Sequence, residues 1–420
     1  MAPGTIGAPG SMPCGCRVAA TPGRSWPSVR SPRPAAGFRY NPQLATHAST
    51  PVFQLAQMTD DRARAARLVV GNYVEPHLGM PLEDAKAVKS VRLEGGKVLV
   101  EVELGFPLAR ARPELEGILQ GMLDNAPDVG ESSVVVRCRV ASHAVQGGLQ
   151  PLHGIANVVA VASGKGGVGK STTAVNLALA LALDGARVGL LDADIYGPSQ
   201  PRMVGLQGAR PVSADGKRME PLVAHGIKVM SIGFLIEEEQ PMVWRGPMVT
   251  QALTQLLSDT NWGELDYLVV DMPPGTGDIQ LTLAQRVPVS GAVVVTTPQD
   301  IALLDARKGL RMFQKVAVPV LGIVENMSTH VCSKCGHQEP VFGSGGGARM
   351  AEQYGVDLLA SLPLDIRIRE ETDGGRPTVV ADPDGPIGRA YLQMARRTSA
   401  RLSLAASSGA PAPRITVEET

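Results

Sequence analysis

A glycine-rich segment between an apolar strand and a helical segment constrains the fold of this chain most. Residues 158–162 are all valine or alanine, as in a buried strand, and residues 172–183 have the apolar spacing of a helix. Between them, Ser163–Thr172 reads SGKGGVGKST and matches the pattern G-x-x-x-x-G-K-[S/T]. The glycines let backbone N–H groups turn inward around phosphates, and the start of the helix adds a positive dipole. The sequence therefore predicts a phosphate-binding loop for a nucleotide.

The residues of this loop predict how the nucleotide would be held. We expect Lys170 to reach the β- and γ-phosphates of ATP and the Ser171 hydroxyl to bind Mg²⁺. The other predicted nucleotide-binding residues of the loop are Gly164, Lys165, Gly166, Gly167, Val168, Gly169 and Thr172.

Carboxylates follow two further apolar strands. The run 190–194, LLDAD, ends one strand, and the run 268–271, LVVD, ends another. Ligands of such sheets bind at the carboxyl ends of the strands, so we predict that Asp192 and Asp271 lie beside Mg²⁺ or its water ligands. A single aspartate after a strand is commonly a helix cap. Three in this order after the loop, Asp194 included, favour a Mg²⁺–nucleotide site.

Short β-branched runs alternate with helical segments from residue 155 to about residue 404. The expected strands are 158–162, 187–191, 267–270, 292–296 and 320–324, and the clearest helices are 172–183 and 299–316. Strands that alternate with helices form a parallel sheet covered on both faces. We therefore predict an α/β ATPase domain, residues 155–404, with a doubly wound, mostly parallel sheet.

A smaller α/β domain is predicted over residues 60–142. Its expected elements are helices at 61–70 and 113–122, a hairpin of strands 87–93 and 97–104, and a strand at 133–140. Cys138, in the last strand, is expected to be buried and unreactive. Residues 143–154 would form a linker and residues 405–420 a disordered tail.

The composition argues against several classes of protein. With 40 basic and 40 acidic residues the chain has no net charge, so no basic field would draw it to nucleic acid or to an anionic membrane. Aromatic residues are only 4 %, too few for a base-stacking surface. No run of about 18 apolar residues could span a membrane. Five cysteines in 420 residues are too few for a disulfide framework and fit a reducing compartment.

Residues 1–59 differ in composition from the rest of the chain. They contain five Arg, no Lys and no acidic residue, and they are rich in Pro, Gly and Ser. We expect them to be disordered. The segment has the composition of an organelle transit peptide, which would predict an organelle matrix. The alternative that we prefer treats residues 1–57 as sequence upstream of a natural start at Met58, which predicts the cytoplasm.

A C-x-x-C pair, Cys332 and Cys335, lies between His330 and His337. Two thiolates on one turn suit Zn²⁺ or an iron–sulfur cluster, but two ligands cannot hold a cluster that needs four. Either the two histidines complete a zinc site in one chain, or two chains contribute two cysteines each. A redox-active pair lacks the expected preceding β–α context, and an inert pair is the remaining alternative.

Six motifs in one order resemble the Mrp (ApbC) family of iron–sulfur cluster carrier ATPases. They are the phosphate-binding loop, DADIYGPS at 192–199, WRGPM at 244–248, DMPPGTGD at 271–278, ENMS at 325–328 and the C-x-x-C pair. This family belongs to the deviant Walker-A ATPases, which include MinD, ParA and nitrogenase iron protein. The resemblance covers residues 60–404 and is most specific in the ATPase half.

The resemblance implies a homodimer that hydrolyses ATP. A [4Fe-4S] cluster would be bridged between the subunits by Cys332 and Cys335 and passed to apo-proteins, with scaffold proteins as further partners. The architecture resembles bacterial members, which also favours the cytoplasm.

The resemblance also implies roles for single residues. Lys165 resembles the signature lysine that reaches the partner's nucleotide, and Asp194 resembles the first-switch residue that positions the attacking water. With Lys170 they are the predicted catalytic residues. Asn326 would contact adenine, and residues 272–278 resemble the second switch.

Two other functions remain open. A MinD- or ParA-like positioning ATPase would bind DNA or membrane and carry a structural zinc site. Against it, residues 395–404 contain three Arg but no broad apolar face. A reductase that moves electrons through its cluster is the third possibility, although the related iron protein has widely separated cysteines.

Overall fold

The computed structural model describes residues 51–147, 149–213, 216–236, 246–332 and 334–407. Most of the expected N-terminal extension and of the expected tail, residues 1–50 and 408–420, lies outside the described residues. The first helix, α1 (Pro51–Gly71), begins before the boundary at residue 60 that the composition predicts. Within the described ranges, no helix is both long and apolar enough to cross a membrane.

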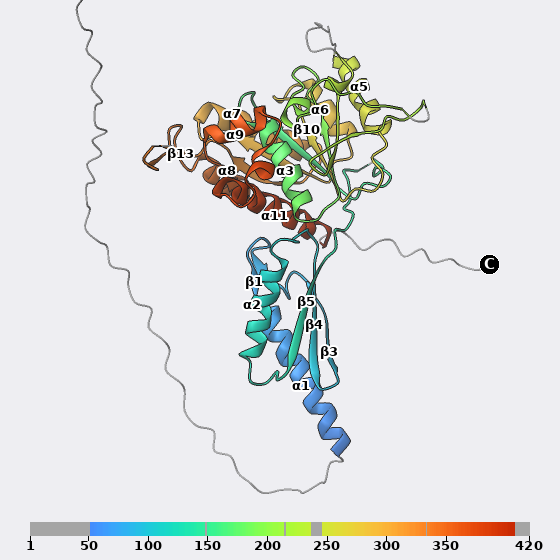
Figure 1. The fold of residues 1–420 in the computed structure, drawn as a ribbon, viewed down its shortest axis with the longest axis vertical. Coiled ribbons are helices and arrows are strands. Elements are labelled where there is room, and N and C mark those ends of the chain that lie inside the picture. The colour runs from blue at the N-terminus through green and yellow to red at the C-terminus, as the bar shows by residue number, and fades with distance from the viewer. Residues whose placement is uncertain (1–50, 148, 214–215, 237–245, 333, 408–420) are drawn as a thin grey trace, which may run out of the picture. The chain divides into compact units, whose positions relative to one another are not determined.

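The larger domain is built on one sheet of eight strands (Figure 1). The strands are β6 (Val158–Ser163), β7 (Val188–Asp192), β8 (Leu222–Ala224), β9 (Ile227–Ser231), β10 (Tyr267–Asp271), β11 (Gly291–Thr296), β12 (Val320–Glu325) and β15 (Leu358–Ser361). Their order is β15-β12-β11-β6-β10-β7-β9-β8, and every neighbouring pair is parallel except β8 with β9. The predicted doubly wound, mostly parallel sheet is confirmed.

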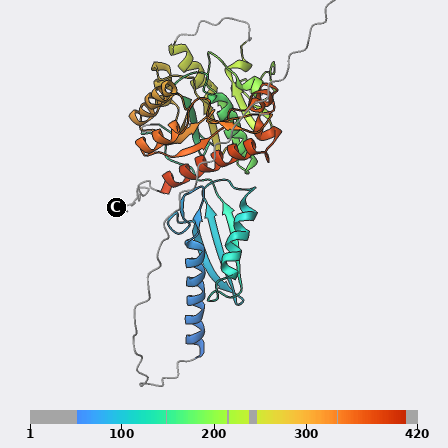
Figure 2. The ribbon, with the colours of Figure 1, turned by 90° about the vertical axis from the view of Figure 1, so that its left-hand side faces the viewer.

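Helices cover both faces of this sheet. The longer ones are α3 (Lys170–Leu183), α5 (Gly246–Ser258), α6 (Asp278–Arg286), α7 (Asp300–Lys315), α8 (Gly346–Tyr354), α9 (Ile366–Asp373) and α11 (Pro386–Ser407). Short turns are α4 (Gln200–Met203), the 3-10 helix η1 (Ile232–Phe234) and α10 (Thr378–Ala381). The connections through α3 and α7 run in opposite directions across the sheet, so right-handed crossovers place these helices on opposite faces. α11 packs against α3 (Figure 2).

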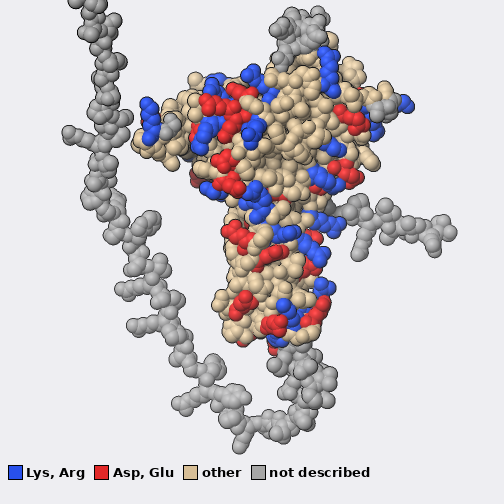
Figure 3. Space-filling model, in the orientation of Figure 1, with Lys and Arg blue, Asp and Glu red and all other residues tan. Residues whose placement is uncertain are grey.

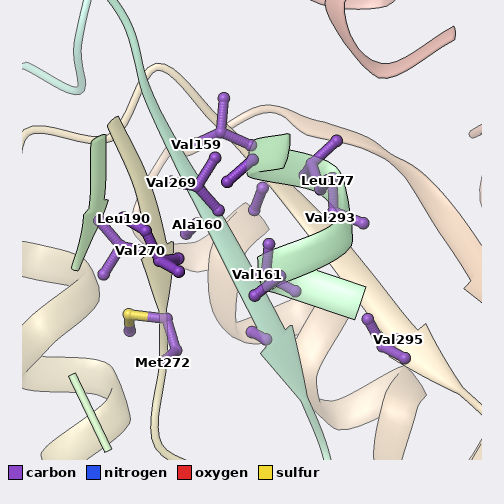
Figure 4. Close-up of a cluster of buried hydrophobic side chains, with 14 of the residues drawn as sticks. Val159, Ala160, Val161, Leu177, Leu190, Val269, Val270, Met272, Val293 and Val295 are labelled. Carbon is purple, nitrogen blue, oxygen red and sulfur yellow. The ribbon is translucent and has the colours of Figure 1, made fainter. Parts of the chain in front are cut away.

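The core of this domain lies between the central strands and the covering helices. Figure 4 shows Val161 of β6, Leu177 of α3 and Val293 of β11 in one cluster of buried side chains. Each central strand is buried along its whole length, which explains the uninterrupted apolar runs in the sequence. The polar groups of the site can therefore lie only where the strands end.

The small domain has its own core beneath a three-stranded sheet. Its elements are α1, β1 (Val74–Glu75), β2 (Met80–Pro81), β3 (Val88–Glu94), β4 (Lys97–Leu104), α2 (Arg112–Asp124) and β5 (Ser132–Cys138). β4 pairs antiparallel with β3, as predicted, and parallel with β5. Cys138 is exposed, so its predicted burial is wrong: it lies at the last residue of β5, an edge strand.

The C-terminal end of α3 joins the two domains. The cap residue Asp184 accepts hydrogen bonds from Arg396 of α11, with Nε at 2.7 Å and Nη2 at 3.0 Å. The carbonyl oxygen of Asp184 accepts from the amide of Ala109, at 2.9 Å, and its carboxylate accepts from the amide of Arg110, at 3.2 Å. α11 also contributes Ala400 to the small domain's core, so this helix belongs to both cores.

The predicted linker packs against the ATPase domain. His143 and Gln146 are both buried. Nδ1 of His143 lies 2.5 Å from Oδ1 of Asn157. The side-chain Nε2 of Gln146 donates hydrogen bonds to the backbone carbonyl oxygens of Ala284 and Val287, both at 2.7 Å. These long-range bonds fix a segment whose sequence alone has no regular pattern.

Candidate nucleotide site and cysteine hairpin

The glycine-rich loop connects β6 to α3 at the carboxyl edge of the sheet. Gly169, the cap residue before α3, has a φ of 82°, a left-handed conformation that glycine adopts without strain. A Cβ atom on Gly169 would lie 2.2 Å from Nδ2 of Asn326, and one on Gly164 would lie 2.1 Å from the carbonyl carbon of Asp305. These two glycines therefore allow the loop to lie directly against the end of β12 and against α7.

Lys170 is buried and paired with an aspartate at the end of β10. Its Nζ lies 2.5 Å from Oδ1 of Asp271, 3.1 Å from the Ser171 hydroxyl and 3.7 Å from Oδ2 of Asp194. The structure thus brings together four residues that the sequence predicts at the site. The ammonium group balances carboxylate charge in a buried place at the start of α3.

Asp192 organises the loop that follows β7. Its carboxylate accepts from four donors: Asp194 N (3.2 Å), Ser199 N (3.0 Å), Gln200 N (3.1 Å) and Ser231 Oγ (3.0 Å). Burial raises the pKa of Asp192, and the neighbouring Asp271 carboxylate raises it further. The side chain therefore fixes the course of residues 194–200, and its contact with Mg²⁺ stays a prediction.

Asp194 is slightly more exposed than the buried residues Lys170, Asp192 and Asp271 beside it. The residue is 9 % exposed. Burial raises the pKa of its carboxyl group, Lys170 opposes that shift, and Asp271 adds to it. Asp194 thus lies within 3.7 Å of Lys170, and its role in positioning the attacking water stays a prediction.

Asn326 braces the phosphate-binding loop. It is buried at the end of β12, and its Nδ2 donates to the carbonyl oxygen of Val168 at 2.9 Å. This contact with the loop was not predicted, and the expected contact with adenine remains a prediction.

The exposed part of the loop is its first half. Lys165, Gly166 and Gly167 are exposed, whereas Val168 is buried and Thr172 lies half-buried in the first turn of α3. Lys165 is exposed on the surface of the loop, and its action across a dimer stays a prediction. Trp244 and Arg245, in another motif of the family, lie outside the described residues.

Sequence reasoning missed one buried residue of this site, Gln200. Its Nε2 donates to Oδ2 of Asp271 at 2.8 Å and to the carbonyl oxygen of Ser171 at 3.1 Å. Its Oε1 is buried and makes no hydrogen bond with the residues that the structure describes. The glutamine directly after the DADIYGPS motif was the only signal available in the sequence.

The oxygen donors of the site fit Mg²⁺. The Ser171 hydroxyl and the Asp271 carboxylate both lie within hydrogen-bond distance of Lys170. The Gln200 side chain donates hydrogen bonds to the Asp271 carboxylate and to the backbone carbonyl of Ser171, and its own Oε1 has no partner among the described residues. Magnesium prefers such hard oxygen ligands and retains several water molecules.

The two cysteines lie on a hairpin that extends from the end of β12. Its strands are β13 (His330–Val331) and β14 (Gln338–Glu339). Cys332 is half-buried and Cys335 is exposed. Backbone N–H groups of Cys335 and Lys334 lower the pKa of the Cys332 thiol, which favours the metal-binding thiolate. Both sulfurs therefore face a surface where another molecule could supply further ligands.

The histidines beside this pair do not join it in one site. Nδ1 of His330 lies 3.2 Å from the carbonyl oxygen of Leu364, and His337 is exposed. Among the residues described, no cluster of three or more His, Cys, Asp or Glu could hold a metal ion. The described part of the hairpin thus presents two thiols without the rest of a zinc site.

Comparisons with known proteins agree with these features. Residues 154–399 match the family described as NUBPL iron-transfer P-loop NTPase, of the ParA group. An iron–sulfur cluster carrier protein of Haemophilus influenzae is 50 % identical over 82 % of this chain and 93 % of its own length. One of Pseudomonas fragi is 60 % identical over 66 % of this chain and 97 % of its own. The mouse iron–sulfur cluster transfer protein NUBPL is 54 % identical over 60 % of this chain and 80 % of its own.

Two solved structures are among those similar to this chain. A nucleotide-binding protein of Archaeoglobus fulgidus in complex with ADP has a TM-score of 0.49 and 39 % identity, over 55 % of this chain and 90 % of that chain. MinD of Pyrococcus horikoshii with Mg-ADP has a TM-score of 0.42 and 21 % identity, over 57 % and 94 %. The match over residues 154–399 includes the phosphate-binding loop, the strand-terminal aspartates and the cysteine hairpin. The chain is a nucleotide-binding ATPase and belongs to the NUBPL iron-transfer family of ParA-type P-loop NTPases.

Proposed function

We propose that this protein is an ATP-hydrolysing carrier that binds a [4Fe-4S] cluster between two subunits and transfers it to apo-proteins. The observation that carries the proposal is the turn with half-buried Cys332 and exposed Cys335, which follows β12 at the same edge of the sheet as the phosphate-binding loop. β12 and β6 are parallel and separated only by β11, so both segments leave the sheet in one direction. The names of the relatives, iron–sulfur cluster carrier and transfer proteins, support a carrier role.

Ligand number favours a shared cluster over a zinc site within one chain. A [4Fe-4S] cluster takes four thiolates, and the described hairpin offers two. Two chains that meet at this edge would supply four. Because such a cluster is open to solvent and held by two subunits, we expect it to be labile, as delivery requires.

Hydrolysis of ATP is proposed to use the residues that converge at the loop. Lys170 would bind the phosphates, Ser171 and Asp271 would hold Mg²⁺, and Asp194 would position the attacking water. The metal ion would supply charge neutralisation at the phosphates. The exposed Lys165 would enter the site of the partner subunit, so nucleotide and cluster would both lie at one dimer interface.

Partners and location follow from the same proposal. The clients would be apo-proteins that need a [4Fe-4S] cluster, and scaffold proteins would supply it. Figure 3 shows basic and acidic residues interspersed on the face in view, which gives no support to a nucleic-acid partner. The cytoplasmic location remains a prediction.

Anaerobic reconstitution with iron and sulfide tests the cluster. We expect one [4Fe-4S] cluster per dimer by absorption spectroscopy and by iron and sulfide analysis, and transfer of it to an apo-enzyme whose activity needs such a cluster. Cys332→Ala and Cys335→Ala should each lose the cluster. Cys138→Ala, which removes another exposed thiol, is the matched control and should retain it.

The zinc alternative gives an opposite pattern in the same experiment. His330→Ala and His337→Ala should leave the cluster intact under the carrier proposal. A purified protein with one tightly bound zinc per monomer, released by His330→Ala, would instead identify a structural zinc site and overturn the proposal.

A further inference from the structure

Gln200 lies where the three parts of the nucleotide site meet. It is the first residue of α4, and it is fully buried. Its backbone N–H donates to Oδ2 of Asp192 at 3.1 Å, which ties it to the end of β7. Its side chain reaches the end of β10 and the first turn of α3. One residue thus contacts all three of the residues predicted to bind Mg²⁺.

The orientation of the Gln200 amide follows from its partners. Both hydrogens of Nε2 are used, one on the carboxylate of Asp271 and one on the carbonyl oxygen of Ser171. The reverse orientation would place Oε1 against two other oxygens, which repel it. Oε1 must therefore be the atom without a partner.

An unpaired carbonyl oxygen in a buried site indicates a missing ligand. Buried polar atoms are almost always hydrogen-bonded, because an unpaired one loses its hydration without compensation. Oε1 is covalently fixed beside Nε2, which contacts Asp271. The donor that Oε1 lacks therefore belongs close to Asp271, where Mg²⁺ and its water ligands are expected.

The hydrogen bond from Gln200 Nε2 to Asp271 would also matter when nucleotide binds. In this structure Asp271 accepts hydrogen bonds from two groups, Lys170 on Oδ1 and Gln200 on Oδ2. When Lys170 turns to the phosphates, the glutamine is the remaining donor that orients this carboxylate. A neutral amide does this without competing with the metal ion for charge.

We propose that Gln200 is a positioning residue for the Mg²⁺ of the bound nucleotide, with Nε2 orienting Asp271 and Oε1 accepting a hydrogen bond from a water ligand of the ion. The proposal rests on the Mg²⁺–ATP site described under the proposed function. It adds a residue to the outer shell of the metal, where loss of one partner typically costs about tenfold or more in metal affinity.

Binding of Mn²⁺ and ADP to the full chain tests this role without any turnover. ADP affinity is measured by calorimetry in EDTA, and Mn²⁺ affinity of the ADP complex by the loss of the free Mn²⁺ signal in electron paramagnetic resonance. Gln200→Met keeps the length of the side chain and removes both hydrogen-bonding groups. We expect it to bind ADP in EDTA as the wild type does and to bind Mn²⁺ about tenfold more weakly or worse.

Two further variants separate positioning from folding. Gln146→Met removes a buried amide at the opposite edge of the sheet, where it bonds Ala284 and Val287, and should leave Mn²⁺ affinity unchanged. Gln200→Asn keeps the amide group but is one methylene shorter, so it cannot reach Asp271 and Ser171 while also placing its oxygen beside the ion. It should weaken Mn²⁺ binding, and it provides the test if Gln200→Met does not fold. Wild-type Mn²⁺ affinity in either folded Gln200 variant overturns the proposal. Failure of the wild-type protein to bind Mn²⁺ with ADP would instead reject the proposed Mg²⁺–ATP site itself.

Discussion

Lys170, the first residue of α3, and Asp271, the last residue of β10, form a buried ion pair with Nζ 2.5 Å from Oδ1. Under the proposed function, ATP would exchange this pair for contacts of Lys170 with phosphate and of Asp271 with Mg²⁺. The two residues proposed to bind phosphate and metal thus balance each other's charge in this structure.

Lys170→Ala should abolish ATP hydrolysis, because it removes the cation that binds the phosphates and leaves Asp271 buried without its charged partner. We also expect destabilisation of several kcal/mol, about 3–5, as for other buried pairs that lose one member. Phosphate release and urea unfolding measure the two effects. Undiminished hydrolysis would mean that the loop is wrongly assigned.

Asp194→Ala should separate binding from turnover. The carboxylate lies 3.7 Å from Lys170 and is not part of its short ion pair, so ATP affinity should stay near that of the wild type. Hydrolysis should fall by about two orders of magnitude or more if this side chain positions the attacking water. Nucleotide affinity by calorimetry and single-turnover hydrolysis check this, and equal losses in both would contradict the role.

Lys165→Ala tests action across the dimer. If the exposed Lys165 acts in the site of the partner subunit, affinity for ATP should be nearly unchanged while hydrolysis falls. Mixing this variant with Lys170→Ala creates heterodimers in which one site has its own Lys170 and receives Lys165 from the partner. Partial recovery of activity in the mixture supports action in trans, whereas an additive loss without recovery argues against it.

His143 makes the stability of the docked linker depend on pH. Burial lowers the pKa of this histidine, against the raising effect of its bond to Asn157, so the folded state binds the proton less readily than the unfolded state. Stability should therefore be fully present above the ordinary value of about 6.5 and decline as the pH falls below it. Urea unfolding between about pH 7.5 and 5 should show a smaller decline in His143→Gln than in the wild type. Equal pH dependence in the two proteins would exclude a contribution from this residue.

The sequence predicts this site well where local patterns determine it. The strand–loop–helix unit at Ser163–Thr172 and the aspartates that end β7 and β10 follow from apolar runs and the positions at which they stop. Parallel pairing then places Asp192 and Asp271 side by side. The sequence contains all the information needed for that convergence.

Long-range contacts between polar residues could not be predicted in this way. Gln200 forms a hydrogen bond with Asp271, which is 71 residues away in the sequence, and Gln146 forms one with Val287, which is 141 residues away. Neither residue lies in a periodic pattern that indicates its partner. The burial of Cys138 was predicted wrongly for a related reason. The apolar, alternating residues around it predict a strand but do not reveal that this strand, β5, lies at the edge of its sheet.

The contacts of Asp184 have a consequence for how clients and ATP could influence each other. α3 begins at Lys170, and its cap residue Asp184 forms hydrogen bonds with Ala109, Arg110 and Arg396. One helix of 14 residues, about 21 Å long, therefore lies between the predicted phosphate site and these contacts with the small domain. Thermodynamic linkage is reciprocal. If ATP changes the affinity of the small domain for a client by some factor, that client changes the affinity for ATP by the same factor. A client bound at the small domain would then change the occupancy of the nucleotide site, and the contacts of Asp184 at the end of α3 are where the two domains meet.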